Sequence, residues 1–354
     1  MKKSKIKVGI NGIGRIGKAI LRNNLDSSSF ELVHINDINP DINNVIYQIN
    51  YDTLYGNLNS EDEFFLNGDL ISNNTTSFSY SSSPNIDEVD WDSRGVDIVI
   101  DSSGIKTNVI KSHDLVKKSN IKHVVITHSP DEVDFTMILG VNEKLFDNDK
   151  HKVISSSICD ATALAPVLSN LNKSFGIDAG HITTLHPWLN YQKLMDGSSS
   201  SWSVPGDIHH HYALGRSSIG NMIPKPTSAL DATCKVLKNL SGKIGSFSYR
   251  TPTNIVGSAD LTIQLSKNVT KEDVIILFEE LQKKQSFNIF NNTVKPLVSI
   301  DFLRTTSSVH IDHRWTEVMN GNLLKMVLWY DNEWGYSSKV VDQVLYISSK
   351  FGNK

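Results

Sequence analysis

The sequence predicts an α/β protein in which a parallel sheet is followed by a second domain. Three observations lead to this fold class. Short apolar strands alternate with helical stretches in the first part of the chain, as in sheets built from parallel strands. A glycine-rich turn lies between the first strand and the first helix. With 354 residues, the chain is also long enough for two domains of ordinary size.

The glycine-rich turn follows a short buried strand expected over 6–10, and a helical pattern continues through 19–21. Its glycines have the spacing Gly12-x-Gly14-x-x-Gly17, which is that of a dinucleotide-binding (Rossmann) fold. In that fold the first glycine allows a tight turn, the second lets the backbone approach the pyrophosphate, and the third permits close packing of the helix on the strand. The turn therefore predicts a dinucleotide whose phosphates lie at the helix N-terminus.

The second strand is expected over 30–36, and Asp37 ends it, 20 positions after Gly17. A carboxylate at this point accepts hydrogen bonds from the hydroxyl groups of the adenosine ribose and repels a 2′-phosphate. NAD is therefore the expected cofactor, in preference to NADP. The alternative interpretation is that Asp37 only caps a turn.

Two later strands are expected over 96–100 and 123–127, with a helix over 109–118 between them. This alternation supports a parallel sheet. Ligands of such sheets bind at the carboxyl ends of the strands. Ser103 and Thr127 lie at two of these ends, and we expect both to contribute to cofactor binding.

Composition and charge exclude several classes of protein. The net charge of −3 gives no electrostatic case for a nucleic acid or an anionic membrane as partner. No apolar run approaches the length needed to cross a membrane. Only two cysteines occur, Cys159 and Cys234, so no disulfide framework is expected and a reducing, cytoplasmic compartment fits best.

A candidate nucleophile lies near the middle of the chain. The small-residue run 155–157 leads to Cys159, and an Ala- and Leu-rich helical pattern follows. A cysteine at a helix N-terminus is favoured as the thiolate, which attacks carbonyl carbon. His186 ends a strand-like run 27 positions later and could meet Cys159 as its base. The alternative is an inert buried thiol and a histidine of the core.

Several motifs, in order along the chain, resemble glyceraldehyde-3-phosphate dehydrogenases. The resemblance extends from residue 7 to about residue 342, and its last motif is highly specific. The motifs are the glycine-rich stretch 7–17, Tyr51-Asp52, Cys159 in its serine-rich context, Leu164-Ala-Pro166, Thr183-Thr-Leu-His186, and Trp329-Tyr-Asp-Asn-Glu-Trp-Gly-Tyr336.

The resemblance implies an NAD-binding domain over 1–158, completed by a C-terminal helix over 333–354. It implies a catalytic α+β domain with an antiparallel sheet over 159–332. It further implies an NAD-dependent oxidation of a small aldehyde, with Cys159 as nucleophile and His186 as base. A homotetramer is the usual assembly of the family.

Cofactor-binding roles also follow from the resemblance. Asn332 is the residue expected to hydrogen-bond the nicotinamide amide, and Tyr336 is expected to pack near the nicotinamide ring. Arg15 and Ile16 are expected to line the pyrophosphate and the adenine side of the cofactor. The long loop 187–215 corresponds to a segment that, in the family, lies near the cofactor of a neighbouring subunit.

Several phosphate ligands of the family are absent from this sequence. Ile158 and Asp160 replace a serine and a threonine that flank the nucleophile, and Asp160 adds a charge that repels phosphate. Leu189 replaces a threonine after the histidine. Leu214 replaces an arginine in the long loop.

Other anion ligands are kept. Arg250 matches the remaining phosphate-binding arginine of the family, and Thr227-Ser228 keeps a hydroxyl while replacing a glycine. We therefore expect retained hydride chemistry with an altered substrate or acyl acceptor. The alternative is a different alignment of the long loop, in which Arg216 or another basic residue supplies the missing charge.

Three functions remain open on the sequence: a phosphorylating glyceraldehyde-3-phosphate dehydrogenase, a dehydrogenase for another small aldehyde with hydrolytic release, and a non-catalytic NAD-binding protein. No metal site is expected. The adjacent histidines His209–His211 of the long loop cannot all face one ion from a regular element.

Overall fold

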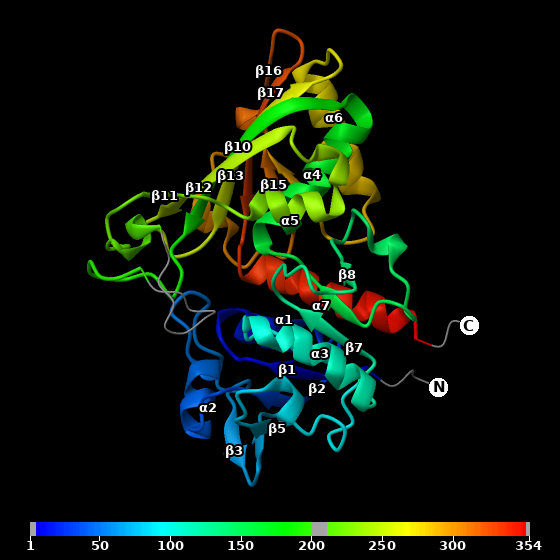
Figure 1. Cartoon of the computed structure of the whole chain (residues 1–354). Helices are drawn as coiled ribbons and strands as arrows, with labels where there is room; N and C mark the ends of the chain where they lie inside the picture. Colours follow the sequence, from blue (N-terminus) through cyan, green and yellow to red (C-terminus); the bar gives the residue numbers. More distant parts are fainter. Residues whose placement is uncertain (1–4, 200–210, 352–354) are drawn as a thin grey trace. The chain divides into compact units, whose positions relative to one another are not determined.

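The computed structural model describes residues 5–199 and 211–351, which form two compact units (Figure 1). Unit 1 contains the described residues up to Met137, Leu145–Ser156, and those from Val340 onward. Unit 2 contains Ile138–Lys144 and the described part of Ser157–Lys339. The mixed α/β fold class predicted from the sequence is confirmed. No helix in the described ranges is long and apolar enough to cross a membrane.

Unit 1 is built on a sheet whose central strands are parallel. The order of the strands is β3-β4-β5-β2-β1-β6-β7-β9-β8. Strands β1, β6 and β7 are nearly continuous apolar runs, as expected for strands covered on both faces. The strands are β1 (Lys7–Asn11), β2 (Glu31–Asn36), β3 (Phe65–Asn67), β4 (Leu70–Ser72), β5 (Ser77–Ser81), β6 (Ile98–Asp101), β7 (His123–Ile126), β8 (Phe135–Thr136) and β9 (Val153–Ser155).

The helices of unit 1 are α1 (Arg15–Ser27), α2 (Ile42–Asn50) and α3 (Lys106–Lys118). Helix α2 begins after Asp41, whose carboxylate accepts hydrogen bonds from the backbone N–H groups of Asn43 and Asn44. A core cluster that includes Trp91, Val99 and Val124, each at most 1% exposed, packs this part of the unit.

Unit 2 contains a second sheet that is mainly antiparallel. Its strand order is β11-β12-β10-β13-β17-β15-β14, and β16 pairs with β17. Two pairs, β10 with β12 and β14 with β15, are parallel. The strands are β10 (Ile177–Pro187), β11 (Ile223–Lys225), β12 (Ile244–Thr251), β13 (Gly257–Leu265), β14 (Phe290–Thr293), β15 (Val309–Asp312), β16 (Glu317–Met319) and β17 (Leu323–Tyr330).

Helix α4 (Cys159–Phe175) covers one face of this sheet, where it contacts β10, β13, β15 and β17. Helix α5 (Ala229–Val236) packs against α4 and β12, and α6 (Lys271–Lys284) packs against β14. Residues Ala161 to Leu168 of α4 are almost fully buried, so its side chains form much of the core of the unit. Helix α7 (Trp334–Ser349) begins in unit 2 and ends in unit 1.

Short 3₁₀ turns complete the described structure. They are η1 (Ile86–Glu88), η2 (Glu143–Leu145), η3 (Tyr212–Gly215), η4 (Lys238–Leu240), η5 (Ser299–Phe302) and η6 (His313–Trp315).

Candidate functional site

The turn between β1 and α1 has the geometry of a phosphate cradle. Gly12 has φ +90°, and a Cβ there would lie 2.6 Å from the backbone nitrogen of Ser103. A Cβ on Gly17 would collide with the carbonyl oxygen of Gly12, so the helix can approach the turn only without a side chain. A Cβ on Gly14 would meet no described atom within 4 Å, which leaves open space at the helix start. The turn therefore fits a bound dinucleotide.

Asp37 follows β2 directly, at the carboxyl end of the strand. Its Oδ2 accepts a hydrogen bond from the backbone N–H of Ile13 (2.8 Å), and its Oδ1 accepts one from Asn39 (3.0 Å). The bond from Asn39 is the kind expected if Asp37 caps a turn, which was the alternative interpretation of this residue. Each carboxylate oxygen has a further lone pair, so the half-buried Asp37 can hold the turn and still accept from a ribose.

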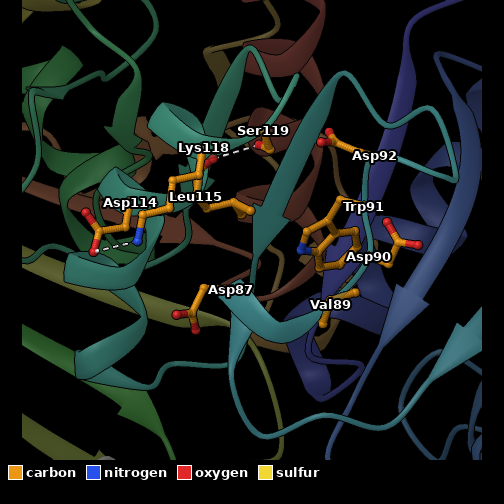
Figure 2. Close-up of a pocket in the computed structure, with 9 residues that line it drawn as sticks. All are labelled: Asp87, Val89, Asp90, Trp91, Asp92, Asp114, Leu115, Lys118 and Ser119. Atoms are coloured by element: carbon orange, nitrogen blue, oxygen red, sulfur yellow. Dashed lines mark hydrogen bonds and ion pairs between the residues drawn. The ribbon is translucent and has the colours of Figure 1, made fainter.

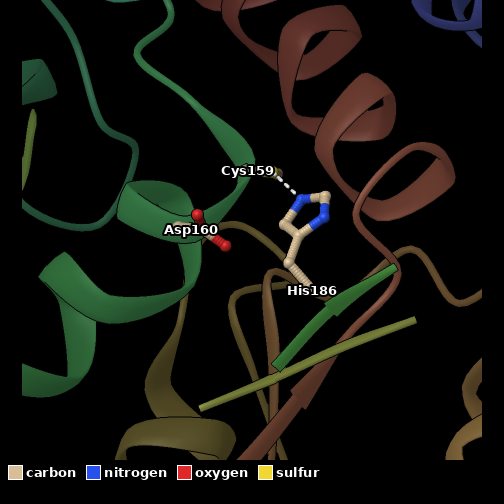
Figure 3. Close-up of side chains that lie close together, drawn as sticks. All are labelled: Cys159, Asp160 and His186. Atoms are coloured by element: carbon tan, nitrogen blue, oxygen red, sulfur yellow. Dashed lines mark hydrogen bonds between the residues drawn. The ribbon is translucent and has the colours of Figure 1, made fainter. Parts of the chain in front are cut away.

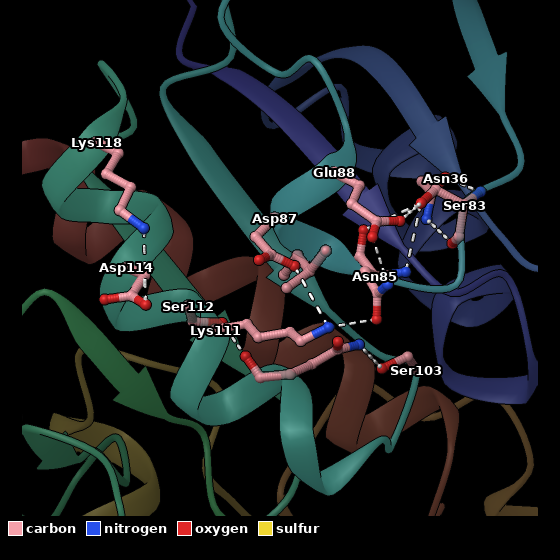
Figure 4. A network of polar contacts seen from close by, with 12 residues as sticks. Asn36, Ser83, Asn85, Asp87, Glu88, Ser103, Lys111, Ser112, Asp114 and Lys118 are labelled. Atoms are coloured by element: carbon pink, nitrogen blue, oxygen red, sulfur yellow. Dashed lines mark hydrogen bonds and ion pairs between the residues drawn. The ribbon is translucent and has the colours of Figure 1, made fainter.

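A polar network fixes the chain beside Asp37 (Figure 4). Asn36 exchanges two hydrogen bonds with the backbone of Ser83, each 2.9 Å long. Asn85 donates to Glu88 (2.7 Å) and accepts from Lys111 of α3, which also pairs with Asp87. Hydrogen bonds and one ion pair thus connect the carboxyl end of β2 to α3, by way of residues 83–88.

Ser103 and Thr127 lie at the carboxyl ends of β6 and β7, as expected. The hydroxyl of Ser103 donates to Asp101 Oδ1 (2.6 Å) and accepts from Asn108 (3.0 Å), while that of Thr127 donates to the Asp101 carbonyl (3.1 Å). These hydroxyls therefore stabilise the carboxyl ends of β6 and β7, and the cofactor-binding roles of Ser103 and Thr127 stay predictions.

Arg15 begins α1 and forms an ion pair with Asp52, in the Tyr51-Asp52 motif. Burial opposes ionisation of Asp52, but the N–H of Tyr55 and the guanidinium of Arg15 lower its pKa to about 2. Ile16 is half-buried in the first turn of α1. Arg15 therefore supports the turn through Asp52, which adds a structural role to the cofactor contact implied by the resemblance.

A pocket of unit 1 lies away from this edge (Figure 2). Its lining includes Trp91 and Asp92, which precede β6, and Ser119, which precedes β7. It also includes Asp114, which pairs with Lys118. Since ligands of parallel sheets bind at the opposite, carboxyl ends of the strands, we assign this acidic pocket no part in the site.

The candidate nucleophile and base meet in unit 2 (Figure 3). Cys159 is the first residue of α4, and its Sγ lies 3.7 Å from Nε2 of His186 in β10. The other ring nitrogen, Nδ1, lies 2.8 Å from the carbonyl oxygen of Pro187. A carbonyl oxygen only accepts, so Nδ1 carries the proton and Nε2 presents a lone pair to the thiol.

The electrostatics of this pair differ from the sequence-based expectation of a thiolate. Burial and the Asp160 carboxylate raise the pKa of Cys159 well above its ordinary value, and the N–H groups at the helix start only partly oppose this. Burial and the charge of Arg250 lower the pKa of His186 to about 4. Desolvation thus outweighs the helix dipole, and the pair consists of a thiol and a neutral imidazole.

Asp160 belongs to the same cluster and is only 7% exposed. Its Oδ1 accepts a hydrogen bond from the hydroxyl of Tyr330, at 2.5 Å. Burial and the charge of Asp160 raise the pKa of Tyr330 well above its ordinary value, so Tyr330 remains a donor. A carboxylate oxygen of Asp160, a ring nitrogen of His186 and Sγ of Cys159 lie within 4.8 Å of one another.

Arg250 lies beside His186 on β12, because the register of the parallel strands pairs the two residues directly. It is 7% exposed, and its Nη2 donates to the hydroxyl of Tyr191 (3.1 Å). Thr227 and Ser228 immediately precede α5; Thr227 is half-buried and accepts from the N–H of Ala229 (3.2 Å). Ser228 is exposed.

The positions that depart from the family offer no anion ligand in their side chains. Ile158 caps α4, Leu189 is half-buried, and Leu214 is buried in η3. Arg216 pairs with Asp196 (2.9 Å), and both side chains are exposed. Within the long loop, Ser200, Ser201, His209 and His210 lie outside the described residues, so the expectation for the histidine triplet stays a prediction.

Asn332 and Tyr336 also belong to unit 2. Asn332 is buried, and its Oδ1 accepts from the N–H of Val256 (3.0 Å), which leaves its NH₂ group as a donor. The hydroxyl of Tyr336 donates to the carbonyl of Ser157 (3.0 Å), two residues before the candidate nucleophile. Their nicotinamide roles stay predictions.

Three residues near the cluster escaped the sequence analysis: Lys225, Tyr191 and Tyr330. The signal for Lys225 in the sequence was its position two residues before Thr227-Ser228. Tyr330 lies inside the specific motif 329–336, where only Asn332 and Tyr336 were singled out.

The same cluster contains three side chains of types that ligate metal ions. Within the described ranges, Cys159, Asp160 and His186 are the one group of three whose ligand atoms could surround a single ion. A metal ion held there would bind the sulfur of the candidate nucleophile, Cys159. We keep the expectation that no metal resides in this site.

Comparison with known proteins defines the class of the chain. Residues 6–109 match the family model described as glyceraldehyde 3-phosphate dehydrogenase, NAD binding domain, and residues 156–332 match the C-terminal domain of the same enzymes. The chain is therefore an NAD-dependent oxidoreductase, and NAD is confirmed as its cofactor.

Full-length relatives narrow this class to one family. Glyceraldehyde-3-phosphate dehydrogenase 1 of Bacillus cereus is 36% identical over 346 residues, which cover 97% of this chain and 99% of that protein. The Bacillus subtilis (strain 168) and Geobacillus stearothermophilus enzymes are 36% and 35% identical, and each alignment covers 98% of this chain and 99% of the relative. The chain belongs to the glyceraldehyde-3-phosphate dehydrogenase family.

Proposed function

We propose that this protein oxidises a small aldehyde through a covalent intermediate on Cys159, with His186 as the base. The observation that carries the proposal is the geometry of the pair. Nε2 of His186 presents its lone pair 3.7 Å from Sγ, and the bond from Nδ1 to Pro187 fixes the tautomer. This is the arrangement of a nucleophile with an adjacent general base.

The proposed steps begin with a neutral pair. Sγ attacks the aldehyde carbon while Nε2 accepts the thiol proton, which then passes to the aldehyde oxygen to give a thiohemiacetal. The N–H of Cys159, at the helix start, is a donor for the developing oxyanion. When bound, NAD supplies the hydride acceptor. His186 removes the hydroxyl proton in that step, which leaves a thioester on Cys159.

The test of this proposal is a pair of variants assayed with a panel of phosphorylated and unphosphorylated aldehydes. Cys159→Ser and His186→Asn should each lower NADH formation by at least about a hundredfold, since each removes one partner of the pair. Their NAD dissociation constants should be unchanged. Aldehyde oxidation retained by Cys159→Ser would contradict the covalent mechanism. Wild-type protein that binds NAD but oxidises no aldehyde of the panel would favour the non-catalytic alternative.

A second candidate function is oxidation of another aldehyde with hydrolytic release of the acid. The observation that favours it is Asp160, a carboxylate held by Tyr330 within 4.8 Å of the nucleophile sulfur. Asp160 repels an incoming phosphate and is suited to accept a proton from water that attacks the thioester.

The choice between the two acyl acceptors is tested by phosphate dependence. We expect weak stimulation by phosphate or arsenate, because Ile158, Leu189 and Leu214 lack the donors found in the family, and poor use of glyceraldehyde 3-phosphate compared with a typical family member. Asp160→Thr should slow acid formation and increase stimulation by phosphate. Strong, saturable stimulation of the unmodified protein would contradict the hydrolytic candidate.

Organisation and location are part of the same proposal. We propose that the NAD-binding role belongs to residues 1–158 with 333–354, and the catalytic role to 159–332. We also propose a homotetramer of 39.5 kDa chains, testable by light scattering. A cytoplasmic location fits the proposed use of Cys159 as a free thiol.

A further inference from the structure

The side chains of Cys159, Asp160 and His186 together offer the three kinds of ligand that a zinc ion takes in proteins (Figure 3). A thiolate, an imidazole nitrogen and a carboxylate oxygen all bind Zn²⁺, whereas Mg²⁺ and Ca²⁺ prefer oxygen ligands alone. One ligand atom of each side chain lies within 4.8 Å of the other two. Asp160 stands where the family is expected to carry a threonine, so the third ligand is a property of this chain.

The distance between the first two ligand atoms fits a shared zinc ion. Sγ of Cys159 lies 3.7 Å from Nε2 of His186. A tetrahedral ion with bonds of about 2.3 Å to sulfur and about 2.1 Å to nitrogen separates these atoms by about 3.6 Å. The same tetrahedron requires about 3.4 Å between the nitrogen and a carboxylate oxygen. Because the observed atoms lie within 4.8 Å of one another, a small rotation of the Asp160 side chain completes the set.

The hydrogen bonds around these ligands are also those of a metal site. Nδ1 of His186 donates to the carbonyl oxygen of Pro187 (2.8 Å), and metal-binding histidines almost always donate their second ring N–H in this way. Metal-binding carboxylates are hydrogen-bonded in turn, and Oδ1 of Asp160 accepts from Tyr330 (2.5 Å). A carboxylate has enough lone pairs to accept this bond and bind an ion as well.

The charges around the cluster predict an ion that exchanges with the solvent. A thiolate and a carboxylate neutralise the two charges of Zn²⁺, but the ion has to displace the thiol proton. The charges of Arg250 and Lys225 both act on His186, and both repel a cation bound there. A reversible inhibitor is therefore expected, and the expectation that no metal resides in the site is kept.

We propose that Cys159, Asp160 and His186 form a three-ligand Zn²⁺ site that inhibits the protein by occupying its nucleophile. A bond forms between Sγ and the ion, the thiol proton passes to the solvent, and no group is oxidised or reduced. The bound ion excludes the aldehyde from Sγ and takes the lone pair of Nε2. Binding of the ion does not depend on the proposed function, whereas inhibition rests on it.

The test measures Zn²⁺ binding to the full chain by calorimetry in a buffer that does not chelate metals, with Mg²⁺ as the control ion. Asp160→Thr introduces the residue expected in the family, and Asp160→Asn keeps the shape of the side chain. Asp231→Asn is the matched control, because Asp231 is exposed and its charge acts on the other thiol, Cys234. A variant with alanine at positions 209–211 controls for the adjacent histidines of the long loop.

We expect a Zn²⁺ binding event that is lost in Cys159→Ser and kept in Asp231→Asn and in the 209–211 variant. Asp160→Thr and Asp160→Asn should each weaken it by at least about tenfold, since even a hydrogen-bond partner of a metal ligand is worth about 10–100-fold in affinity. Both variants are expected to lower the pKa of the thiol, which favours metal binding, so a net loss reports the missing ligand. Tyr330→Phe should weaken binding by about tenfold.

Two further measurements follow the ion at the sulfur. Co²⁺ bound in place of Zn²⁺ should give a thiolate-to-cobalt absorption band that is absent from Cys159→Ser. Zn²⁺ should inhibit NADH formation by the unmodified protein with a Ki that agrees with the calorimetric Kd, and EDTA should restore the activity. Mg²⁺ should neither bind nor inhibit.

Equal affinity of Asp160→Thr and the unmodified protein would overturn the proposal, because binding would then need only Cys159 and His186. Failure of the unmodified protein to bind Zn²⁺ would also overturn it. Circular dichroism shows whether the variants fold, and Asp160→Asn carries the comparison if Asp160→Thr does not. Asp160-dependent Zn²⁺ binding by a protein that oxidises no aldehyde would keep the metal site and remove the proposed function, whereas aldehyde oxidation without Zn²⁺ binding would remove the metal site alone.

Discussion

At the scale of single residues, the site is governed by desolvation. Cys159 begins a helix, where the dipole favours a thiolate, but burial and Asp160 raise its pKa instead. The helix dipole contributes about 0.3–1 kcal/mol, which is less than the cost of burying an unpaired charge. In the proposed mechanism His186 removes the proton during attack, and its neutral state, with a pKa of about 4, suits that task.

Removal of the Asp160 charge should make Cys159 more reactive. Since that charge raises the pKa of the thiol, Asp160→Asn should lower the pKa and increase the thiolate fraction at pH 7.5. The rate of alkylation of Cys159 by iodoacetamide, followed by peptide mass spectrometry, should rise severalfold. Asp231→Asn is the matched control, because burial and then the Asp231 charge raise the pKa of Cys234. An unchanged rate at Cys159 would show that Asp160 does not control the thiol.

We expect a single residue, Asp37, to determine the preference for NAD over NADP. Asp37→Ala should reduce the ratio of the NADP dissociation constant to the NAD dissociation constant by roughly tenfold or more. The substitution removes the hydrogen bonds to the ribose of NAD, and it also removes the charge that repels the 2′-phosphate of NADP. Asp37→Asn separates these effects, because it keeps an acceptor for the N–H of Ile13 and removes only the charge. Equal binding of both dinucleotides by the unmodified protein would contradict this role.

At the scale of elements, the sequence predicted well what depends on local pattern. The helical pattern expected after Cys159 is α4, which begins at Cys159 and ends at Phe175, and the glycine turn lies between β1 and α1 as expected. His186 was expected to end a strand, and the strand that carries it, β10 (Ile177–Pro187), continues one residue beyond it.

What the sequence could not show depends on long-range pairing. Lys225 and Arg250 are far apart in the chain, and only the register of β11 on β12 places them on one face. The contact between Tyr330 and Asp160 likewise joins the end of β17 to the start of α4. Burial and the Asp160 carboxylate raise the pKa of Cys159, which is opposite to the direction expected from its position at a helix start alone.

Two glycine substitutions separate the fold of the turn from its function. Gly17→Ala should lower both thermal stability and NAD affinity, because its Cβ meets the carbonyl oxygen of Gly12. Gly14→Ala has open space around its Cβ and a negative φ, so it should leave the melting temperature nearly unchanged. It should still weaken NAD binding if the pyrophosphate of the cofactor approaches the protein backbone at this position. Unchanged NAD affinity of Gly14→Ala would contradict that approach.

At the scale of the whole molecule, buried histidines connect stability to pH. Burial lowers the pKa of His34, His123, His186 and His310 to about 4 each. The unfolded chain binds these protons near pH 6.5 and the native state does not, so the free energy of unfolding falls as pH falls below 6.5. The slope reaches about 1.4 kcal/mol per pH unit for each histidine.

We therefore expect the melting temperature to decrease between pH 7 and pH 5. His310→Phe should make this decrease shallower, because Nε2 of His310 has no hydrogen-bond partner within the described ranges and its ring packs against Phe302. Thermal melts at fixed ionic strength measure both quantities. A melting temperature independent of pH over this range would show that these histidines are not held neutral.

The most direct test of the account is a single-turnover measurement of the intermediate on Cys159. Protein is mixed with NAD and the best aldehyde of the panel, quenched with acid, digested and analysed by mass spectrometry. The account predicts one NADH per active chain in a rapid phase, together with an acyl group on the Cys159 peptide that is absent from Cys159→Ser and from a sample without NAD. NADH formed at the same rate with no acyl group on Cys159, or with the group on Cys234, would contradict it.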